Sequence, residues 1–363
     1  MFTPAGFHHH APRLMGMADA TASATQPPPS LLDIDVLASS ATTPNAGGPL
    51  VAAAGTHLTS TRSWHGSVLA GPCRWDLPAG ASRIRWIGHG GLFVVGTDAG
   101  RLVTGRICPV TDTDLAIEPV DVAAAPLHRP GPISALSWNP DDGLILSASS
   151  RSLGIVVSDP EGGMVVGKLA GPASQCHPHL AGVLAAEWCP STGGSASVAW
   201  ADRRGVIRLW DRAVDGSSPG GGLTLLSEAH CTAGARTPGG RPRALAFRAT
   251  SGIPTLLVST SNGTLELMDL RQPGSFVETL FSGALSAIES VRPSPFGRDL
   301  AMSTMDGEVL VLSAPVGHEP ASADPIAARR IDARSSPVTG VAWLAPDQLV
   351  SCSHDGSLIE HAL

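Results

Sequence analysis

The chain has 363 residues, a formal net charge of −7 and only 15% charged residues. This balance argues against a direct nucleic-acid partner, because a nucleic-acid interface needs a positive field to neutralise phosphates. No apolar run approaches the roughly 20 residues that span a bilayer, and the six cysteines include no CxxC pair, so we expect no membrane contact, reduced thiols and a location in the cytoplasm and nucleus.

Residues 1–30 combine five prolines with small polar residues and show no hydrophobic period. Such a segment cannot bury enough surface to offset the entropy lost on ordering, so we expect a disordered N-terminal tail. His8, His9 and His10 lie within it, and adjacent histidines in such a tail are more often exposed to solvent than bound to a metal.

Residues 31–80 form the least regular unit of the chain. Alternating apolar residues predict strands at residues 31–37, 50–54 and 61–69. We interpret these strands as the first of several similar sheets.

From residue 82 onward, a large apolar residue precedes the glycine of a tight turn by 13 to 17 residues, six times over. The pairs are Trp86 and Gly100, Trp138 and Gly154, Trp188 and Gly205, Phe247 and Gly263, Val291 and Gly307, and Trp343 and Gly356. The corresponding units span residues 82–107, 133–160, 182–212, 243–271, 285–313 and 338–363. Self-similarity at a fixed period is the signature of a repeat architecture.

Three of these turns contain the dipeptides Asn262-Gly263, Asp306-Gly307 and Asp355-Gly356. Both central residues of a two-residue hairpin of the primed types have positive φ, which Asn-Gly and Asp-Gly tolerate. We therefore predict two-residue hairpins between the second and third strands of these units.

Within the unit of residues 182–212, the stretch at residues 205–211 ends in Leu209-Trp210-Asp211. This ending is similar to the one that closes each unit of a WD-repeat propeller. Six such units and the irregular first one suit the roughly 45 residues per blade of a seven-bladed propeller. We expect an all-β, seven-bladed WD-repeat β-propeller over residues 31–363.

The resemblance also assigns structural roles within the repeats. Trp210 and Asp211 close one unit, Asp306 and Asp355 hold the acidic turn position, and His179 precedes Trp188 by nine residues, where WD repeats carry a histidine that hydrogen-bonds across the blade. Cys176, His177, His179 and Cys189 are also zinc-ligand types, but their spacing fits no standard zinc pattern, so we expect no metal.

The final unit stops at Leu363, shortly after its third strand. A strand there would expose unpaired backbone groups at its edge. We expect a segment within residues 25–40 to pair with this last unit.

No motif for catalysis stands in a usable context. The chain has no GxSxG elbow, Walker loop or HExxH pair, and no set of charged residues evidently converges on a central channel. The glycine-rich residues 214–222 predict a flexible loop rather than a phosphate cradle, and residues 229–242 and 315–330 predict similar connectors. We expect no enzyme activity, no cofactor and a role in protein interaction.

Three stretches resemble the methylosome protein 50 family, the WD-repeat subunits of the arginine methyltransferase methylosome. They are residues 61–68 (TRSWHGSV), 85–92 (RWIGHGGL) and 262–269 (NGTLELMD). The resemblance implies a hetero-oligomer in which Trp64, with Arg62 and His65 beside it, docks on a type II (symmetric) protein arginine methyltransferase. It also implies arginine-rich substrates such as histones and Sm proteins. Trp64 can equally be a core residue of its strand.

Other WD-repeat scaffolds are the alternative, such as a nucleoporin or a substrate receptor of a cullin ligase. Asp269-Leu270-Arg271 has the aspartate-x-arginine ending that is associated with docking on a ligase adaptor. The same ending occurs in propellers that have no link to ligases.

Overall fold

The computed structural model places every described residue in strands, turns or irregular segments, and the described part of the chain contains no helix. It describes residues 13–14, 30–37, 50–58, 64–70, 73–87, 91–110, 115–122, 128, 131–141, 143–149, 155–158, 165–169, 182–189, 197–213, 222–230, 240–250, 253–270, 276–297, 299–313 and 328–363.

The described strands form seven four-stranded antiparallel sheets. The first contains β2 (Ser30–Leu37), β3 (Leu50–Leu58), β4 (Trp64–Ala70) and β5 (Cys73–Leu77), and the second β6 (Ala81–Trp86), β7 (Leu92–Thr97), β8 (Leu102–Pro109) and β9 (Leu115–Val122). The third contains β10 (Ile133–Asn139), β11 (Leu144–Ser149), β12 (Ile155–Ser158) and β13 (Val165–Leu169).

Four further sheets follow in chain order. The fourth contains β14 (Val183–Cys189), β15 (Ser197–Asp202), β16 (Val206–Ala213) and β17 (Gly222–His230), and the fifth β18 (Pro242–Thr250), β19 (Ile253–Thr260), β20 (Leu265–Asp269) and β21 (Phe276–Phe281). The sixth contains β22 (Ile288–Pro293), β23 (Asp299–Thr304), β24 (Glu308–Ser313) and β25 (Ala328–Ala333), and the seventh β26 (Val338–Ala345), β27 (Gln348–Ser353), β28 (Leu358–Ala362) and β1 (Arg13–Leu14).

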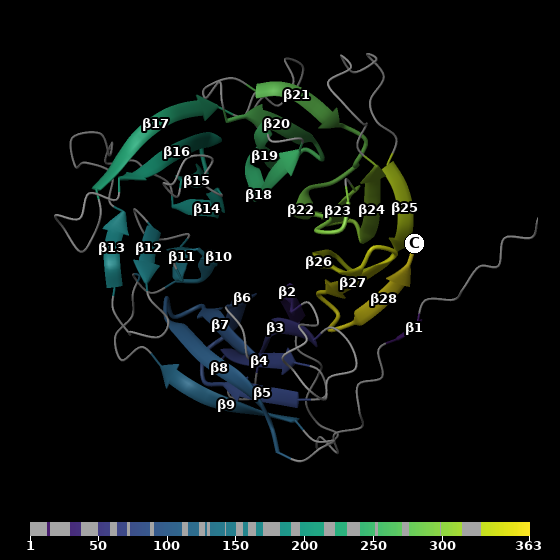
Figure 1. Cartoon of the computed structure of the whole chain (residues 1–363). Helices are drawn as coiled ribbons and strands as arrows, with labels where there is room; N and C mark the ends of the chain where they lie inside the picture. The colour runs from purple at the N-terminus through teal and green to yellow at the C-terminus, as the bar shows by residue number, and fades with distance from the viewer. Residues whose placement is uncertain are drawn as a thin grey trace, which may run out of the picture.

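The sheets stand around a common centre like the blades of a propeller (Figure 1). The first strand of each unit lies nearest the centre, and the later strands follow outward in chain order. This radial repetition is the arrangement of a β-propeller. The all-β fold expected from the sequence is therefore confirmed.

Neighbouring sheets pack face to face, which explains why the second strands are almost wholly buried. All six residues of β7 and of β11 are buried. Phe93 on β7 is fully buried, and its ring meets the edges or faces of Trp75 and Trp86 at centroid separations of 6.2 and 5.5 Å. Burying a side chain of this size contributes roughly 1.5–3 kcal/mol, so the contacts between sheets hold the ring together.

The turns between second and third strands depart from the predicted type. Gly263 has a φ of +75°, its N–H donates to Thr260 O at 3.3 Å, and Thr260 N–H donates to Thr264 O at 3.0 Å. These bonds enclose three loop residues, so the predicted two-residue hairpin is wrong. A type I turn followed by a left-handed glycine has this pattern, and only the glycine then needs positive φ.

The other predicted turn glycines behave in the same way. Gly100, Gly205, Gly307 and Gly356 all have positive φ, between 75° and 95°, and each donates to the carbonyl three residues before it. Gly154 lies outside the described residues. The glycine positions in the repeats are thus confirmed, although the loop is one residue longer than predicted.

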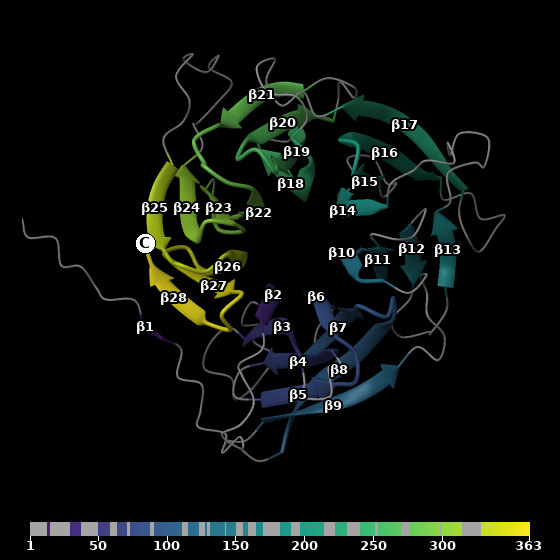
Figure 2. The ribbon, with the colours of Figure 1, turned by 180° about the vertical axis from the view of Figure 1, so that it is seen from behind.

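The N-terminal part of the chain meets the last sheet in two places. Strand β1 pairs with β28 through Arg13 and Glu360 and through Leu14 and Ile359, and both views show it on the outer side of that sheet (Figures 1 and 2). The prediction that residues 25–40 supply the missing edge strand is wrong, because β2 is the innermost strand of the first sheet. Apart from residues 13–14 and 30, the predicted tail lies outside the described residues.

Strand β2 joins the first sheet to the last at the centre of the ring. The Thr339 hydroxyl on β26 donates to Leu31 O at 2.8 Å. Leu31 and Ile34, both fully buried, share a hydrophobic cluster with Ala342 and Val350 of the last sheet. The contact between the two ends of the chain is therefore made by side-chain packing as well as by the edge strand.

Within the described ranges, no segment is a helix long and apolar enough to cross a membrane.

Candidate functional site

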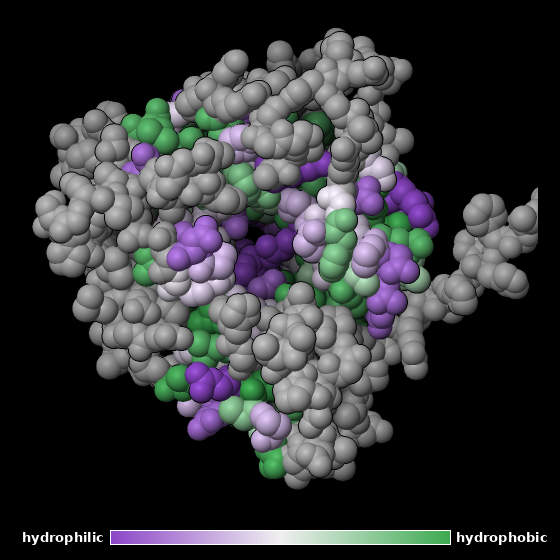
Figure 3. Space-filling model, in the orientation of Figure 1, coloured by the Kyte–Doolittle hydropathy of each residue, from purple (hydrophilic) through white to green (hydrophobic). Residues whose placement is uncertain are grey.

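A hollow lined by hydrophilic residues opens at the centre of the ring (Figure 3). It contains a cavity of about 140 Å³ to which all seven innermost strands contribute. The charged side chains that line the cavity are Asp33, Arg83, Arg85, Glu187, Arg243, Glu289 and Arg292. The expectation that no set of charged residues converges on the central channel is therefore wrong. The first strand of each sheet supplies the residues that line the cavity. Side chains that are about 50 residues apart in the sequence therefore meet at the centre.

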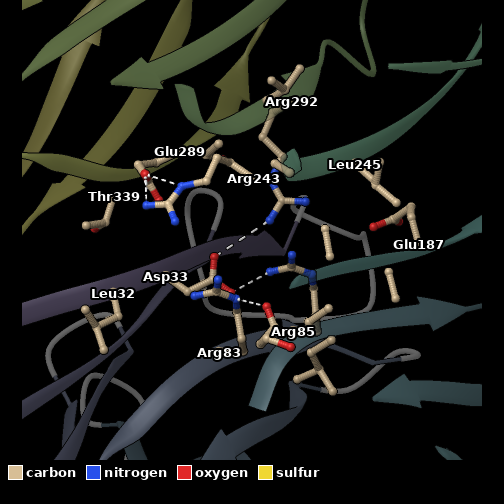
Figure 4. A pocket seen from close by; sticks show the side chains of 18 residues that line it. Leu32, Asp33, Arg83, Arg85, Glu187, Arg243, Leu245, Glu289, Arg292 and Thr339 are labelled. Carbon is tan, nitrogen blue, oxygen red and sulfur yellow. Dashed lines mark hydrogen bonds and ion pairs between the residues drawn. The ribbon is translucent and has the colours of Figure 1, made fainter. Parts of the chain in front are cut away.

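Asp33 and Arg85 form the most enclosed ion pair of the cavity. Arg85 Nη1 lies 2.9 Å from Asp33 Oδ2, and the same oxygen accepts the Ile84 N–H at 3.1 Å (Figure 4). Burial raises the pKa of Asp33, but the arginines around it outweigh burial, so its pKa lies below the ordinary value. Burial alone would lower the pKa of Arg85, yet Asp33 raises it. Asp33 is therefore ionised and already occupied.

Arg243 and Glu289 form a second pair between neighbouring sheets. Arg243 donates to Glu289 Oε1 through both Nε, at 2.8 Å, and Nη2. Strands β18 and β22 supply the two residues, so this pair ties the fifth sheet to the sixth across the channel wall (Figure 4).

Glu187 and Arg292 are less well compensated. Glu187 Oε1 accepts a hydrogen bond from Ser137 Oγ at 2.9 Å, and burial raises the pKa of Glu187. Arg292 Nη2 lies 3.9 Å from Asp33 Oδ1, and its buried Nε has no hydrogen-bond partner in the described part of the chain. Burial and the neighbouring charge of Arg85 lower the pKa of Arg292. The guanidinium of Arg292 is thus the group with capacity for a further contact.

The chemistry of this set favours binding. Asp33 and Glu289 are each held by an arginine, which leaves them poorly suited to accept a proton from a substrate. Among the described residues, no three His, Cys, Asp or Glu side chains lie close enough to hold a metal ion. Arginine side chains that point into a polar cavity are the groups that recognise carboxylates and phosphates.

Of the residues for which a partner-binding role was expected, Trp64 and His65 lie on the first sheet and do not line this cavity. Trp64 is the first residue of β4 and pairs with Leu58, while the half-buried His65 pairs with His57. Arg62 and the side chain of Trp64 lie outside the described residues.

The residues for which a structural role was expected are spread over the fourth, sixth and seventh sheets. Trp188 and Trp210 are buried on β14 and β16, and Trp210 packs on Trp200 at a centroid separation of 5.1 Å. Within the described ranges, the indole nitrogens of Trp188 and Trp210 and Asp211 Oδ1 have no hydrogen-bond partner. His179 lies outside the described residues.

Asp306 and Asp355 lie in turns and are exposed. Asp306 Oδ1 accepts a hydrogen bond from the Thr304 hydroxyl, and Asp355 Oδ1 accepts the Ser357 N–H at 2.8 Å. Burial raises the pKa of each carboxyl, but the hydroxyl groups of neighbouring residues outweigh it and lower the pKa.

Sequence reasoning assigned no role to two buried histidines, each of which hydrogen-bonds to a serine on the second strand of a sheet. His128 Nε2 lies 3.0 Å from Ser147 Oγ, and His361 Nε2 lies 2.7 Å from Ser351 Oγ. His361 occupies the position at which Trp210 stands in its own unit. The sequence could have revealed the role of His361 through this equivalent position, because a histidine there can hydrogen-bond to the serine hydroxyl of the second strand.

The sequence matches no protein-family profile and no curated protein. The structure matches the crystal structure of Sqt1 from Chaetomium thermophilum with a TM-score of 0.63, at 15% sequence identity, covering 97% of this chain and 100% of that one. The match establishes the fold. In all, 1265 solved chains match this structure. A fold that is so widely shared does not identify a function.

Proposed function

We propose that the protein is a non-catalytic scaffold of the WD-repeat type, in which the seven sheets are the blades of one propeller. It acts in the cytoplasm and nucleus as part of a hetero-oligomer. Its partner is a type II protein arginine methyltransferase, to which it presents arginine-rich substrates such as histones and Sm proteins.

The observation that carries the scaffold role is the way the charged residues of the channel are used. Asp33 and Glu289 are engaged by Arg85 and Arg243, and Glu187 accepts a hydrogen bond from the Ser137 hydroxyl, so each carboxylate at the centre is held by another residue of the channel wall. A rigid ring of sheets offers its partners a large preformed surface, which lowers the entropic cost of association.

The methyltransferase partner rests on the sequence resemblance of the first sheet. Trp64 begins β4, at the end of its pairing with β3, so it lies at the border of the sheet. Tryptophan is among the residue types most enriched at the hot spots of protein interfaces. The net charge of −7 supports the proposed substrates, because a negative field speeds the encounter with arginine-rich chains.

The experiment is a binding measurement with purified methyltransferase and a Trp64→Ala variant. We expect the variant to bind at least about 30-fold more weakly, which corresponds to the roughly 2 kcal/mol of a hot spot. Arg74→Ala is the matched control, because Arg74 lies on β5 of the same sheet and pairs there with Asp76. We expect Arg74→Ala to bind as the wild type does.

Thermal unfolding of both variants separates lost binding from lost fold. Wild-type affinity in a folded Trp64→Ala variant would show that the assignment of Trp64 is wrong. Mass spectrometry of co-purified proteins tests the wider proposal, since a nuclear-pore subcomplex or a cullin-ligase adaptor in place of the methyltransferase would favour the alternative scaffolds.

A further inference from the structure

Positive side chains outnumber negative ones in the central cavity, although the chain as a whole is negative. Four arginines line the cavity, namely Arg83, Arg85, Arg243 and Arg292, against three carboxylates. They come from β6, β18 and β22, so three separate sheets aim guanidinium groups at one space of about 140 Å³. Low-dielectric walls strengthen the field of such a cluster.

Two of these arginines already have an ionic partner. Arg85 is paired with Asp33 and Arg243 with Glu289. Among the described residues, the guanidinium of Arg83 donates only to carbonyl oxygens, namely Ser134 O through Nε and Ser82 O through Nη1, both at 2.9 Å. The positive charge of Arg83 is therefore not neutralised by a direct partner.

Arg292 is the least satisfied of the four. Its contact with a carboxylate is the long one of 3.9 Å to Asp33, which also accepts from Arg85 and from the Ile84 N–H. Its Nε is buried and has no partner among the residues that the structure describes. A buried donor without a partner is destabilising, and more so when the group is charged. An acceptor that enters the cavity would remove this cost.

We propose that the central cavity binds a small oxyanion, with Arg292 as its principal ligand and Arg83 as a second source of positive charge. The volume suits an anion of the size of phosphate or of one carboxylate side chain, and a guanidinium offers such oxygens two parallel N–H donors. The hydrophilic hollow in Figure 3 gives access from one face of the ring. This site does not depend on docking at Trp64.

The oxyanion can come from two sources, which are free phosphate and the acidic side chain of a protein partner. Titration calorimetry in a phosphate-free buffer tests both, with inorganic phosphate in one arm and a short glutamate-rich peptide in the other. We expect at least one of these probes to bind wild-type protein, and an Arg292→Gln variant to bind that probe at least tenfold more weakly. The arm that binds identifies the source.

Arg330→Gln is the matched control for charge. It removes the same formal charge, but the Arg330 side chain is 63% exposed and pairs with Glu308 on the outside of the sixth sheet. We expect it to bind like the wild type. Absence of binding by the wild type in both arms, equal binding by Arg292→Gln, or equal weakening by Arg330→Gln would each overturn the proposal.

Thermal unfolding without ligand separates binding from a structural role. If Arg292 serves a ligand, its replacement removes an unsatisfied buried donor, so the melting temperature of Arg292→Gln should equal or exceed that of the wild type. The rise in melting temperature that the bound probe gives the wild type should be absent in the variant. A markedly lower melting temperature of the ligand-free variant would show instead that Arg292 holds the fold.

Discussion

His361 is a buried histidine on β28 whose surroundings disfavour its charged form. Its Nε2 lies 2.7 Å from Ser351 Oγ and 3.3 Å from Nη2 of Arg334. Burial and the positive charge of Arg334 lower the pKa of His361 from 6.5 to about 4. The neutral imidazole can accept a hydrogen bond there, whereas the imidazolium would face a second cation.

This shift predicts a loss of stability in mild acid. Well above pH 6.5, His361 is neutral in both the folded and the unfolded chain, so it does not change how the free energy of unfolding depends on pH. As the pH falls from 6.5 towards 4, the unfolded chain binds a proton that the folded chain refuses, so the free energy of unfolding should fall, by roughly 2–3 kcal/mol at pH 4.5. Urea unfolding at pH 7.5 and pH 4.5 should show a smaller acid loss for His361→Gln.

His354→Gln provides the control for this measurement, because His354 is exposed in the turn of the same sheet. It should lose as much stability in acid as the wild type does. An equal acid loss in His361→Gln would mean that His361 is not the group responsible.

The charged cavity shows what the sequence could and could not reveal about single residues. Arg85 pairs with a residue 52 positions away, Glu187 with one 50 positions away and Arg243 with one 46 positions away. A polar residue in each innermost strand, repeated at about the period of the units, was therefore a usable signal. The sequence could not show which charged residues pair with one another, or that Arg292 lacks a hydrogen-bond partner at Nε among the residues described. Both depend on how neighbouring sheets are rotated against one another.

The turns give a prediction for a structural element. Gly307 has a φ of +95°, and a Cβ built there would lie 2.2 Å from the backbone oxygen of Arg334. Gly307→Ala should therefore lower the free energy of unfolding by at least about 2 kcal/mol, because both the backbone conformation and the close contact oppose a side chain. Denaturant unfolding of the purified variant measures the loss.

Gly297 is the matched control, since a Cβ built there would meet no atom within 4 Å and its φ is not in the left-handed region. Gly297→Ala should change stability by less than about 0.5 kcal/mol. Similar values for the two variants would show that the turn tolerates a side chain.

Inner and middle strands could be predicted from the sequence far better than outer ones. Strand β11 is wholly buried, and it lies inside the predicted unit of residues 133–160. Strand β25 has no buried residue, and residues 315–330 had been predicted as a connector although β25 begins at Ala328. An outer strand packs on few neighbours: β25 pairs with β24 and contributes only the partly buried Ala328 and Ile331 to hydrophobic clusters, so it shows no hydrophobic period.

At the scale of the whole molecule, the two N-terminal strands should differ in their importance. Strand β1 contributes a pair of two residues, whereas β2 contributes Leu31 and Ile34 to the core shared with the last sheet. Deletion of residues 1–25 should therefore cost about 1 kcal/mol and leave the fold intact. Deletion of residues 1–38 should lower the free energy of unfolding by more than the roughly 5–15 kcal/mol that stabilise a domain. We therefore expect this truncated chain not to fold.

Far-UV circular dichroism and size-exclusion chromatography of the two truncated chains check this expectation. Loss of the fold on removal of residues 1–25 would show that the edge strand contributes more than its two pairs suggest. A folded chain without residues 1–38 would show that β2 is dispensable.

The hydrogen bond between Thr339 and Leu31 spans 308 residues of sequence. The entropic cost of closing so long a loop rises only slowly with its length, so the contact is affordable at equilibrium. On the ribosome, however, β2 has to wait until almost the entire chain has been synthesised before its partner exists. Leu31 and Ile34 stay unburied during that time, so the nascent chain should be slow to mature and prone to capture by chaperones.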